Sequence, residues 1–496
     1  MKRKEERERF IVTILPLHPA QNASPAALRA FLGECRAAAA RDRHPKLVSI
    51  SLAVDALDPL AVLESIFEPA APHFYAERPS IESAVAGAEV AATFTGRGAT
   101  RFADVQTWID ETLAHTIAVG DVAAPFGGPH FFAGFTFHDE IEAGEPFAPA
   151  SAFVPRWQVA RAGATSTAVA NLVIAPDSDL DGMAERVWRA HGKFTRFDYR
   201  GARGIAGVRA VEKPADAPSS PRAPRRFTTS EAGDYRAAVG QAVQRIAAGD
   251  FKKIVLARAQ DVQADEPLHP LEMLNGLRER FPDCYSFSFT RGAGPSFIGA
   301  SPERLVRVSK SILETEALAG SMRRGATASE DAALADALLH SEKDGREQQE
   351  VLDDIVARLA PLGVAPEFST RPHVRRFANV QHLQTAVRAT LPPGVRLLDV
   401  LGALHPTPAV GGSPRAAAVS RIRELEGFPR GLYAGALGWM NARGGGEFFV
   451  CIRSALVDGA TARIYAGAGI VAGSTPEKEF SETELKFKAM LEALLT

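Results

Sequence analysis

The segment most informative about the fold reads GAGIVAGSTPEKEFSETELK and spans residues 467–486. Its first part, Gly467–Ser474, is rich in glycine and predicts the end of a strand followed by a turn. Glycines there would let a ligand approach backbone N–H groups closely. The apolar residues that follow repeat at helical spacing and predict a helix over Pro476–Leu494. A strand that leads into a long C-terminal helix indicates an architecture that mixes both element types.

Two predicted helices carry acidic residues on one face. In the final helix Glu479, Glu482 and Lys486 stand at helical spacing, and Asp344 and Glu347 do so in the segment SEKDGREQQE. Each charged face, taken alone, is explained more simply as a solvated surface. Carboxylates from two helices could nevertheless hold one hard cation such as Mg²⁺, which commonly binds one or two carboxylates together with substrate and water.

Two further ionisable residues stand in apolar surroundings. Lys253 begins the segment KIVLAR, and Glu303 lies in FIGASPERL. Either side chain could point into solvent and have no function. In a closed site, however, burial favours the uncharged forms, so that a lysine can act as a base and a carboxylic acid can donate a proton. The two residues are therefore candidates for proton transfer.

The composition is that of an ordinary globular protein. Of the 496 residues, 46% are hydrophobic and 23% are charged, and the formal net charge is −2. This balance gives no reason to expect nucleic acid or an anionic membrane as a partner. The cysteines Cys35, Cys284 and Cys451 form no CxxC pair, which favours a reducing compartment over a disulfide or zinc framework. Since neither a signal sequence nor a membrane span is recognisable, a cytoplasmic location is expected.

A segment rich in proline, alanine and serine, Glu212–Arg226, has the composition of a connection. Before it the patterns are weak, and no catalytic constellation is recognisable. The residues PHFFAGFTF, 129–137, predict a buried strand with a close backbone approach at Gly134. The other predicted strands are Phe10–Leu15, Leu47–Leu52 and Phe251–Val262. Helices are predicted at Ala26–Ala40, Asp179–His191 and Ser230–Ala248, with one or two more within Asp331–Leu362.

Ten segments occur in an order that resembles one known family. They are KIVLAR, GASPERL, TEALAGS, SEKDGRE, NVQHL, LHPTPAVGG, YAGALGW, CIRSA, YAGAGIV and EKEFSETELK. In these segments the chain is similar to the chorismate-utilising enzymes, which include isochorismate synthases, salicylate synthases, anthranilate synthase component I and aminodeoxychorismate synthase. The resemblance runs from Phe227 to the C-terminus, about half of the chain.

This resemblance implies a fold of the α/β (α+β) class. The expected architecture is a large sandwich of two antiparallel sheets with helices outside, as in anthranilate synthase component I and the isochorismate synthases. Residues 1–226 would form the N-terminal half of that fold, which supports the sheets, and residues 227–496 the chorismate-binding catalytic region. The proline-rich segment would then be an internal connection rather than a domain boundary.

The resemblance also implies roles for single residues. Lys253 matches the base that activates water, and Glu303 matches the acid that protonates the departing hydroxyl. Glu347 and Glu482 match the Mg²⁺ ligands, with Asp344 and Glu479 close to the metal. Because chorismate is a dianion, it needs cations and backbone donors. The residues that match the substrate-binding groups are Gly320, Ser321, His382, Ala409, Tyr433, Arg453, Gly467 and Lys486.

Within this family the residues favour an isochorismate synthase. Such an enzyme converts chorismate reversibly to isochorismate by attack of water at C2 and loss of the C4 hydroxyl. Lys253 stands where anthranilate synthases have glutamine, which favours water over ammonia and makes a glutamine amidotransferase subunit unexpected. Ala319 replaces the nucleophilic lysine of aminodeoxychorismate synthases, and Ala409 stands where salicylate synthases tend to have threonine.

Two alternatives stay open. One is a salicylate synthase, which also eliminates pyruvate, and the other is a non-catalytic chorismate-binding relative. The second is disfavoured because the four residues matched to the base, the acid and the metal ligands are all present. One residue departs from the family pattern, since Gln348 stands where many relatives have histidine. The sequence leaves open whether isochorismate would serve menaquinone, siderophore or salicylate synthesis, and it does not predict the oligomeric state.

Overall fold

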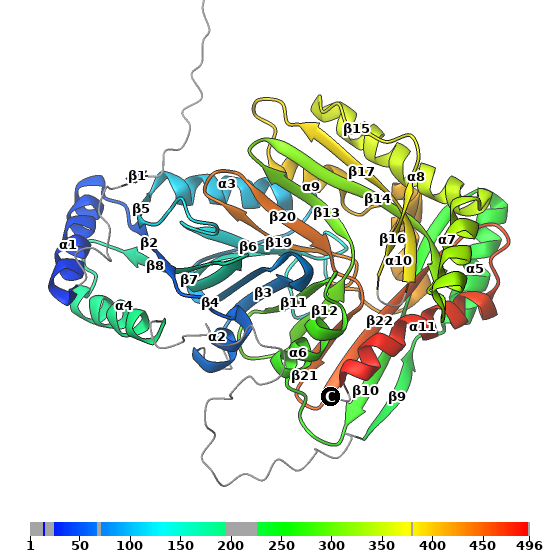
Figure 1. Ribbon diagram of the computed structural model, residues 1–496, viewed down its shortest axis with the longest axis horizontal. Coiled ribbons are helices and arrows are strands. Elements are labelled where there is room, and N and C mark those ends of the chain that lie inside the picture. Colours follow the sequence, from blue (N-terminus) through cyan, green and yellow to red (C-terminus); the bar gives the residue numbers. More distant parts are fainter. Residues whose placement is uncertain (1–12, 15–23, 67–70, 195–225, 378–379, 495–496) are drawn as a thin grey trace, which may run out of the picture.

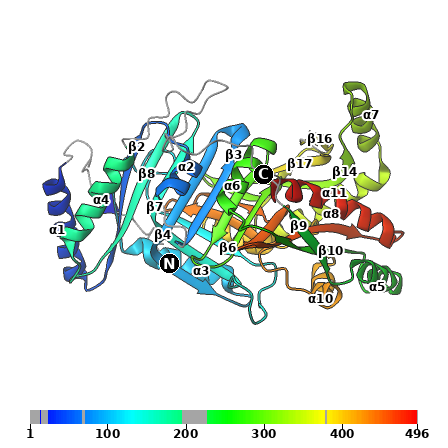
Figure 2. The same ribbon diagram turned by 90° about the horizontal axis from the view of Figure 1, so that it is seen from below.

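The computed structural model describes residues 13–14, 24–66, 71–194, 226–377 and 380–494. The proline-rich segment Glu212–Arg226 lies outside these ranges except for Arg226. Figure 1 shows a central body of strands with helices along its outside, α1 and α4 at one end and α5, α7 and α11 at the other. In the view from below, α1 and α4 again lie side by side, far from α11 (Figure 2).

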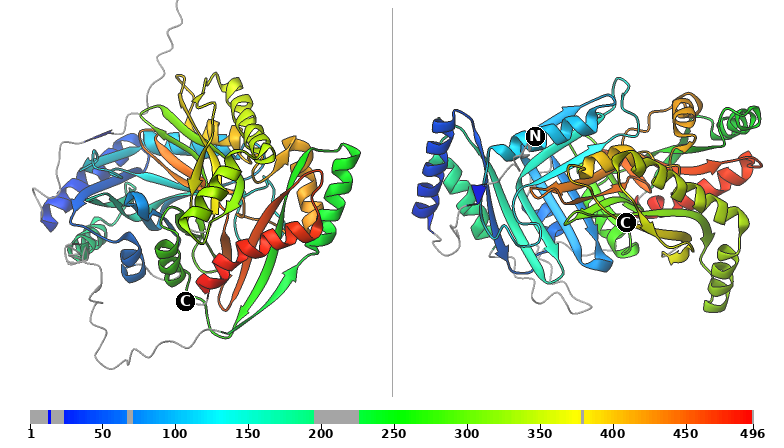
Figure 3. Two further views of the ribbon diagram at one scale, coloured as in Figure 1. Left: turned by 45° about the vertical axis from the view of Figure 1, so that its right-hand side comes forward. Right: turned by 90° about the horizontal axis from the view of Figure 1, so that it is seen from above.

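The helices of the described residues cover the edges and outer faces of the strands. Their bounds are α1 Pro25–Asp42, α2 Pro59–Ile66, α3 Arg101–Ala114, α4 Leu180–Phe194, α5 Tyr235–Ala248, α6 Pro270–Arg280, α7 Ala328–Leu339, α8 Glu342–Leu359, α9 Leu397–Leu404, α10 Arg415–Glu426 and α11 Pro476–Leu494, with short 3-10 turns at η1 Pro79–Ile81 and η2 Ala360–Leu362. The left panel of Figure 3 shows α11 running along the strands β10 (Lys253–Ala264) and β22 (Thr461–Ile470).

The 22 strands of the described residues join into one hydrogen-bonded network. Besides β10 and β22 they are β1 Thr13–Ile14, β2 Lys46–Val54, β3 His73–Arg78, β4 Ser83–Gly96, β5 Thr116–Gly120, β6 His130–Phe135, β7 Ala150–Ala162, β8 Thr165–Ile174, β9 Phe227–Ala232, β11 Tyr285–Thr290, β12 Ser296–Ser301, β13 Arg304–Ser309, β14 Ile312–Arg323, β15 Glu367–Phe368, β16 His373–Arg376, β17 Val380–Thr390, β18 Gly412–Ser413, β19 Ala436–Asn441, β20 Gly446–Val450 and β21 Ser454–Asp458. Their pairings are antiparallel except for those of β5 with β1 and β2. The predicted mixed, antiparallel fold class is confirmed.

Most elements predicted from the sequence are present, with shifted ends. The C-terminal helix has the predicted bounds, and Leu47–Leu52 lies within β2. The predicted start of the next helix, at Ser230, is wrong, because residues 230–232 belong to β9 and pair with β10. Asp234 caps α5 by accepting the N–H of Ala237 at 3.0 Å, so the helix begins at Tyr235. Of the predicted strand Phe10–Leu15, only residues 13 and 14 are described, and they form β1.

At Gly134, where a close backbone approach was predicted, the nearest atoms belong to side chains of the core. Buried aromatic residues from β3, β6, β11, β12 and β20 fill the interior. In β6, a side chain at Gly134 would place its Cβ 2.8 Å from Leu437 Cδ2 in the neighbouring strand β19. The glycine therefore leaves room for the Leu437 side chain, which would have to shift if a Cβ were added.

Strands from the two halves of the chain pair directly. β3 pairs with β11, where Glu77 stands opposite Ser286, and β6 pairs with β19, where Phe132 stands opposite Trp439. The N-terminal strands therefore continue the sheet that the C-terminal strands begin, so each half covers a strand edge of the other.

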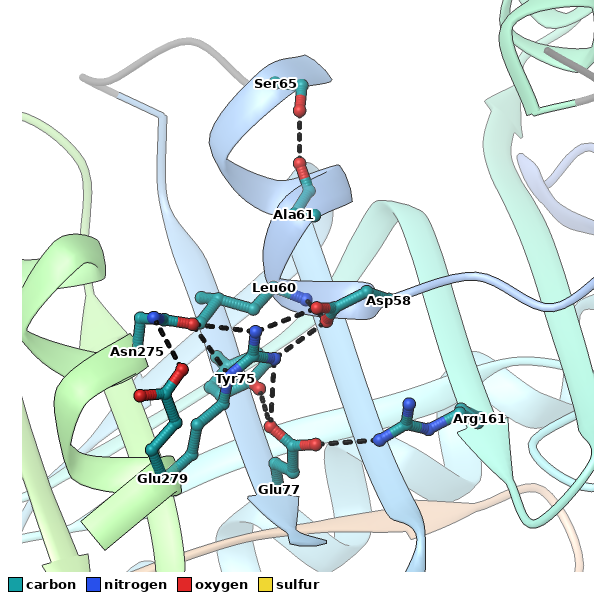
Figure 4. Close-up of polar contacts among 10 residues, drawn as sticks. Asp58, Leu60, Ala61, Ser65, Tyr75, Glu77, Arg161, Asn275 and Glu279 are labelled. Atoms are coloured by element: carbon teal, nitrogen blue, oxygen red, sulfur yellow. Dashed lines mark hydrogen bonds and ion pairs between the residues drawn. The ribbon is translucent and has the colours of Figure 1, made fainter. Parts of the chain in front are cut away.

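A charged network adds to this connection (Figure 4). Arg278 in α6 donates to both carboxylate oxygens of Asp58 at 2.9 and 2.8 Å and to Glu77 at 3.4 Å. Glu77, which is 3% exposed, also accepts from Arg161 at 2.8 Å and from the hydroxyl of Tyr75. Such a buried carboxylate is tolerated because it is paired on several sides. The network joins α6, from the C-terminal half, to β3, β7 and the start of α2.

The described residues contain no helix that combines the length and the apolar character needed to cross a membrane.

Candidate active site

Lys253 stands at the start of β10 and is almost completely buried. Its side chain is 3% exposed, and Nζ donates to Glu347 Oε1 at 2.7 Å. On the adjacent strand β22, a Cβ at Gly469 would lie 3.0 Å from Lys253 Cε. The glycine thus leaves room for the lysine stem, and the carboxylate compensates the burial of its charge. The sequence-based prediction of Lys253 in a closed environment agrees with this geometry.

Glu303 lies between β12 and β13 and is 9% exposed. Its N–H donates to Ser301 Oγ at 3.3 Å, and its carbonyl oxygen accepts the N–H of Val450 at 3.0 Å. Burial raises the pKa of its carboxyl from the ordinary 4.5 to about 8; the negative charge of Glu316 adds to this shift, and the charge of Lys253 opposes it. At neutral pH the group is therefore mostly a neutral acid that can donate a proton.

The four predicted metal-site carboxylates lie on α8 and α11. Glu347 is paired with Lys253, and Glu482 is paired with Lys486 at 2.7 Å. Burial raises the pKa of Glu479, and the negative charge of Glu482 adds to that shift. The positive charge of Lys343, in α8, lowers the pKa of Glu479 in α11 and opposes this shift. The acidic faces of the two helices are therefore near one another.

No preassembled metal site of three acidic, histidine or cysteine side chains exists among the residues that the structure describes. The donors are nevertheless suited to a hard cation. Mg²⁺ binds oxygen ligands and is often held by one or two carboxylates, with substrate and water completing its coordination. A cation would also relieve the repulsion between Glu479 and Glu482. The residues able to hold it are Glu347 and Glu482, with Asp344 and Glu479 nearby.

Arg453 is the best-placed partner for a ligand carboxylate. Its Nη1 atom is buried and has no hydrogen-bond partner among the described residues. Burial lowers the pKa of its guanidinium, and a hydrogen bond to Cys284 opposes that shift. An unpaired buried donor is costly, and an anionic ligand would satisfy it.

His382 joins this group of residues through hydrogen bonds. Its Nδ1 atom lies 2.9 Å from Ser321 Oγ and 3.2 Å from the carbonyl oxygen of Gly320. Burial lowers the pKa of His382 to about 3, and the positive charges of Arg453 and Lys486 act in the same direction. His382 is therefore neutral, and the two cations come from the connection between β20 and β21 and from α11.

Gly320 connects this group to the first acidic helix. Its φ of 69° lies in the left-handed region, and a Cβ there would meet Asp344 Cβ at 2.9 Å. Both features require glycine. The residue therefore allows β14 to pass directly over the start of α8, where Ser341 caps the helix by accepting the N–H of Asp344.

Gly467 connects Lys486 to Tyr433. Lys486 Nζ donates to the Gly467 carbonyl oxygen at 2.7 Å, and the Tyr433 hydroxyl would lie 2.7 Å from a Cβ at Gly467. Tyr433 is buried and stacks on Tyr465 with ring centroids 4.9 Å apart. The predicted residues of β10, β14, β22, α8 and α11 are thus linked by a chain of contacts.

Ala409 lies half-buried in the loop that leads to β18. This loop is fixed by Arg430 and Glu426, two fully buried residues that sequence reasoning missed. Arg430 is paired with Glu426 and donates to the carbonyl oxygens of Val410 at 2.9 Å and Val255 at 2.7 Å. It thereby joins the loop to the strand that carries Lys253. The only sequence signal for the pair is its i, i+4 spacing, which occurs on many exposed helices.

Two open pockets, of about 620 and 250 Å³, lie near the end of β10 that is opposite Lys253 and near the start of β22. Residues such as Asp261, Arg463 and Thr461 line the larger one, and none of the predicted site residues lines either. At the predicted site, the ion pair of Lys253 with Glu347 connects β10 to α8, and the hydrogen bond from Lys486 to the Gly467 carbonyl oxygen connects α11 to β22.

Comparisons with known proteins identify a family and several relatives of this chain. Residues 31–495 match the family described as chorismate binding enzyme. The salicylate biosynthesis isochorismate synthase of Pseudomonas aeruginosa is 36% identical over 463 residues, 92% of each chain. The isochorismate synthase MenF of Bacillus subtilis is 30% identical and aligns over 91% of this chain and 94% of its own. The solved structure of MenF, the menaquinone-specific isochorismate synthase of Escherichia coli, has a TM-score of 0.73 at 26% identity and covers 94% of this chain and 100% of its own.

These alignments extend the resemblance beyond the ten C-terminal segments. The family match begins at residue 31, so it includes the N-terminal half, in which the sequence alone gave little signal. β3 and β6 of that half lie in one sheet with strands of the C-terminal half. The chain therefore belongs to the family of chorismate-binding enzymes.

Proposed function

We propose that the protein is an isochorismate synthase, which converts chorismate reversibly to isochorismate. One observation carries this proposal: a buried lysine and a buried carboxylic acid, Lys253 and Glu303, act on each other electrostatically within one site. The reaction needs one group that accepts a proton and one that donates a proton. The names of the two relatives aligned over most of the chain support the same activity.

The proposed chemistry uses these two groups on opposite sides of one displacement. Lys253, in its uncharged form, takes a proton from the water that attacks C2. The ring double bonds shift, and the C4 hydroxyl leaves as water with the proton of Glu303. Each placed proton-transfer group typically contributes about 10²–10⁴-fold to the rate. In the reverse direction the two residues exchange roles.

The substrate's carboxylates would be held by donors that are otherwise unsatisfied or clustered. Arg453 offers its unpaired Nη1, and Lys486 supplies a second positive charge. Ser321, Gly320 and neutral His382 supply hydrogen-bonding groups beside them. Holding a dianion at several points fixes the ring for attack.

Mg²⁺ is the proposed cofactor, held by Glu347 and Glu482 with Asp344 and Glu479 nearby. When bound, it would orient a substrate carboxylate and neutralise its charge. The carboxylates of α8 and α11 supply the oxygen donors that this ion prefers. Binding would compete with Lys253 and Lys486 for their carboxylate partners.

Two further expectations belong to the proposal. The buried cysteines Cys35, Cys284 and Cys451 are free, which suits the reducing cytoplasm. Water rather than ammonia is the nucleophile, so no amidotransferase subunit is expected.

The test is incubation of the purified protein with chorismate and Mg²⁺, with and without EDTA, followed by chromatography of the products. Isochorismate that forms with Mg²⁺ and disappears with EDTA is the expected result. Salicylate and pyruvate would indicate that Ala409 does not prevent the lyase step. Unchanged chorismate under both conditions would refute the catalytic proposal and leave a binding protein.

A further inference from the structure

A second buried glutamate lies next to the backbone of Glu303. Glu316 stands in β14 and is 6% exposed. Its Oε2 accepts from Arg375 at 2.9 Å and from the side-chain amide of Gln384, and its Oε1 accepts the backbone N–H of Arg304 at 3.3 Å. Arg304 is the residue that follows Glu303. The carboxylate of Glu316 is therefore bonded to the peptide on which Glu303 stands.

The surroundings of the two carboxyl groups differ. Glu316 forms an ion pair with Arg375 and accepts three hydrogen bonds, which is the environment of a charged carboxylate. The carboxyl of Glu303 makes no hydrogen bond or ion pair with another residue that the structure describes, so nothing among those residues compensates a negative charge on it. Two neighbouring buried carboxyls cannot both ionise cheaply, and the unpaired one keeps its proton.

We propose that Glu316 is a positioning residue for proton donation: it fixes the backbone of Glu303 and, through its negative charge, keeps Glu303 in its acid form. This inference rests on the proposed function, in which Glu303 is the acid. The electrostatics agree, because the charge of Glu316 is the largest cause, after burial, of the raised pKa of Glu303.

Other charged groups near Glu303 also affect the pKa of its carboxyl. From β10, the positive charge of Lys253 lowers the pKa of Glu303 and so opposes Glu316. From β16, Arg375 neutralises part of the charge on Glu316. Glu316 must therefore act against two cations, and removal of its charge leaves only burial to favour the acid form of Glu303.

The test compares Glu316→Gln with Glu314→Gln. Glu314 stands two residues earlier in β14, has a side chain that is 34% exposed, and pairs with Arg304 and Arg307. Glu314→Gln therefore removes the same charge at a position outside the site. The measurements are kcat/KM against pH, which reports the groups of the free enzyme, and the melting temperature.

In the parent enzyme, activity should fall with rising pH as Glu303 loses its proton, near pH 8. In Glu316→Gln this fall should begin about one pH unit lower than in the parent. At a pH above both transitions, kcat/KM of Glu316→Gln should therefore be about tenfold lower than that of the parent. Glu314→Gln should have the same pH profile as the parent. A folded Glu316→Gln enzyme with the parent's pH profile would overturn the proposal, as would an equal shift in Glu314→Gln.

A second variant keeps the proposal testable if Glu316→Gln fails to fold. Arg375→Gln leaves the charge of Glu316 less compensated, so the fall in activity should move to higher pH. A shift to lower pH, or none, would contradict the role of Glu316. Because the parent is assayed for isochorismate in the same series, an inactive parent refutes the proposed function, whereas an active parent with unshifted variants refutes this inference alone.

Discussion

Lys253 is the single residue on which the proposed chemistry depends most. It is buried at the start of β10, and its ammonium group bonds to Glu347. Lys253→Met keeps the aliphatic stem and removes the nitrogen, so we expect kcat to fall by about 10²–10⁴-fold while the protein stays folded. The control is Lys252→Met, which changes an exposed neighbour and should leave kcat unchanged. Near-parental kcat in Lys253→Met would show that another group activates water.

Glu303 has a consequence for stability as well as for catalysis. Its pKa is raised from 4.5 to about 8 by burial, so the folded protein binds the proton more tightly than the unfolded chain. Stability from this proton is fully present below about pH 4.5 and is lost as the pH rises through about 8. Glu303→Gln cannot titrate. We therefore expect the difference in melting temperature, Glu303→Gln minus parent, to increase from acidic to alkaline pH. Calorimetry at several pH values measures it.

A melting-temperature difference that stays constant across this pH range would contradict the raised pKa. The catalytic effect is separate. Glu303→Gln should lose isochorismate formation at every pH, because the amide has no proton to donate to the leaving hydroxyl.

Single residues also mark the limit of what the sequence could predict. Lys253 and Glu303 were identified because their segments belong to a recognisable order of motifs. Glu316 stands in one of those motifs, TEALAGS, but nothing local distinguishes it from an exposed strand residue. Its partners Arg375 and Gln384 come from β16 and β17, and only the folded sheet brings them together.

At the scale of elements, α8 must hold Glu347 in place, and Gln348 anchors this helix. The Gln348 side chain is 3% exposed and donates to the carbonyl oxygen of Ala317 at 2.9 Å and to Thr385 Oγ1 at 3.1 Å. It thus bonds to β14 and β17, at a position where the resemblance implies histidine in many relatives. The departure from the family pattern is accommodated by hydrogen bonds to the sheet.

Gln348→Ala should destabilise the protein by about 1–3 kcal/mol, because it leaves buried groups of Ala317 and Thr385 without a donor. The KM for Mg²⁺ should rise as Glu347 loses its fixed position. Denaturant unfolding and Mg²⁺ titration measure the two effects. Gln349→Ala removes an adjacent exposed amide that bonds only to Asp353 among the described residues, and it should change neither quantity. Equal effects of both substitutions would mean that α8 is not anchored through Gln348.

The ends of elements show why local pattern was not sufficient. Apolar spacing predicted the C-terminal helix correctly, because its apolar face packs on β22. The helix predicted from Ser230 begins instead at Tyr235, since Ser230 pairs with Asp261 in β10. Strand pairing is a long-range contact, and a short window of sequence does not contain it.

At the scale of the whole molecule, the two halves of the chain complete one another. β3 pairs with β11, β6 pairs with β19, and Arg278 joins Asp58 and Glu77 across the same boundary. Each half alone would expose long strand edges. We therefore expect residues 1–226 and 227–496, expressed as separate chains, to be unfolded or aggregated alone and to form an active complex when co-expressed. A soluble, active 227–496 fragment on its own would contradict this expectation.

The most direct test of the proposed reaction follows the oxygen atom. Chorismate is incubated with the protein and Mg²⁺ in water enriched in oxygen-18, and the product is analysed by mass spectrometry before equilibrium is reached. Attack of water at C2 with loss of the C4 hydroxyl predicts isochorismate that carries one labelled oxygen, at C2. Isochorismate without label would contradict water attack, and the absence of isochorismate would contradict the proposed function itself.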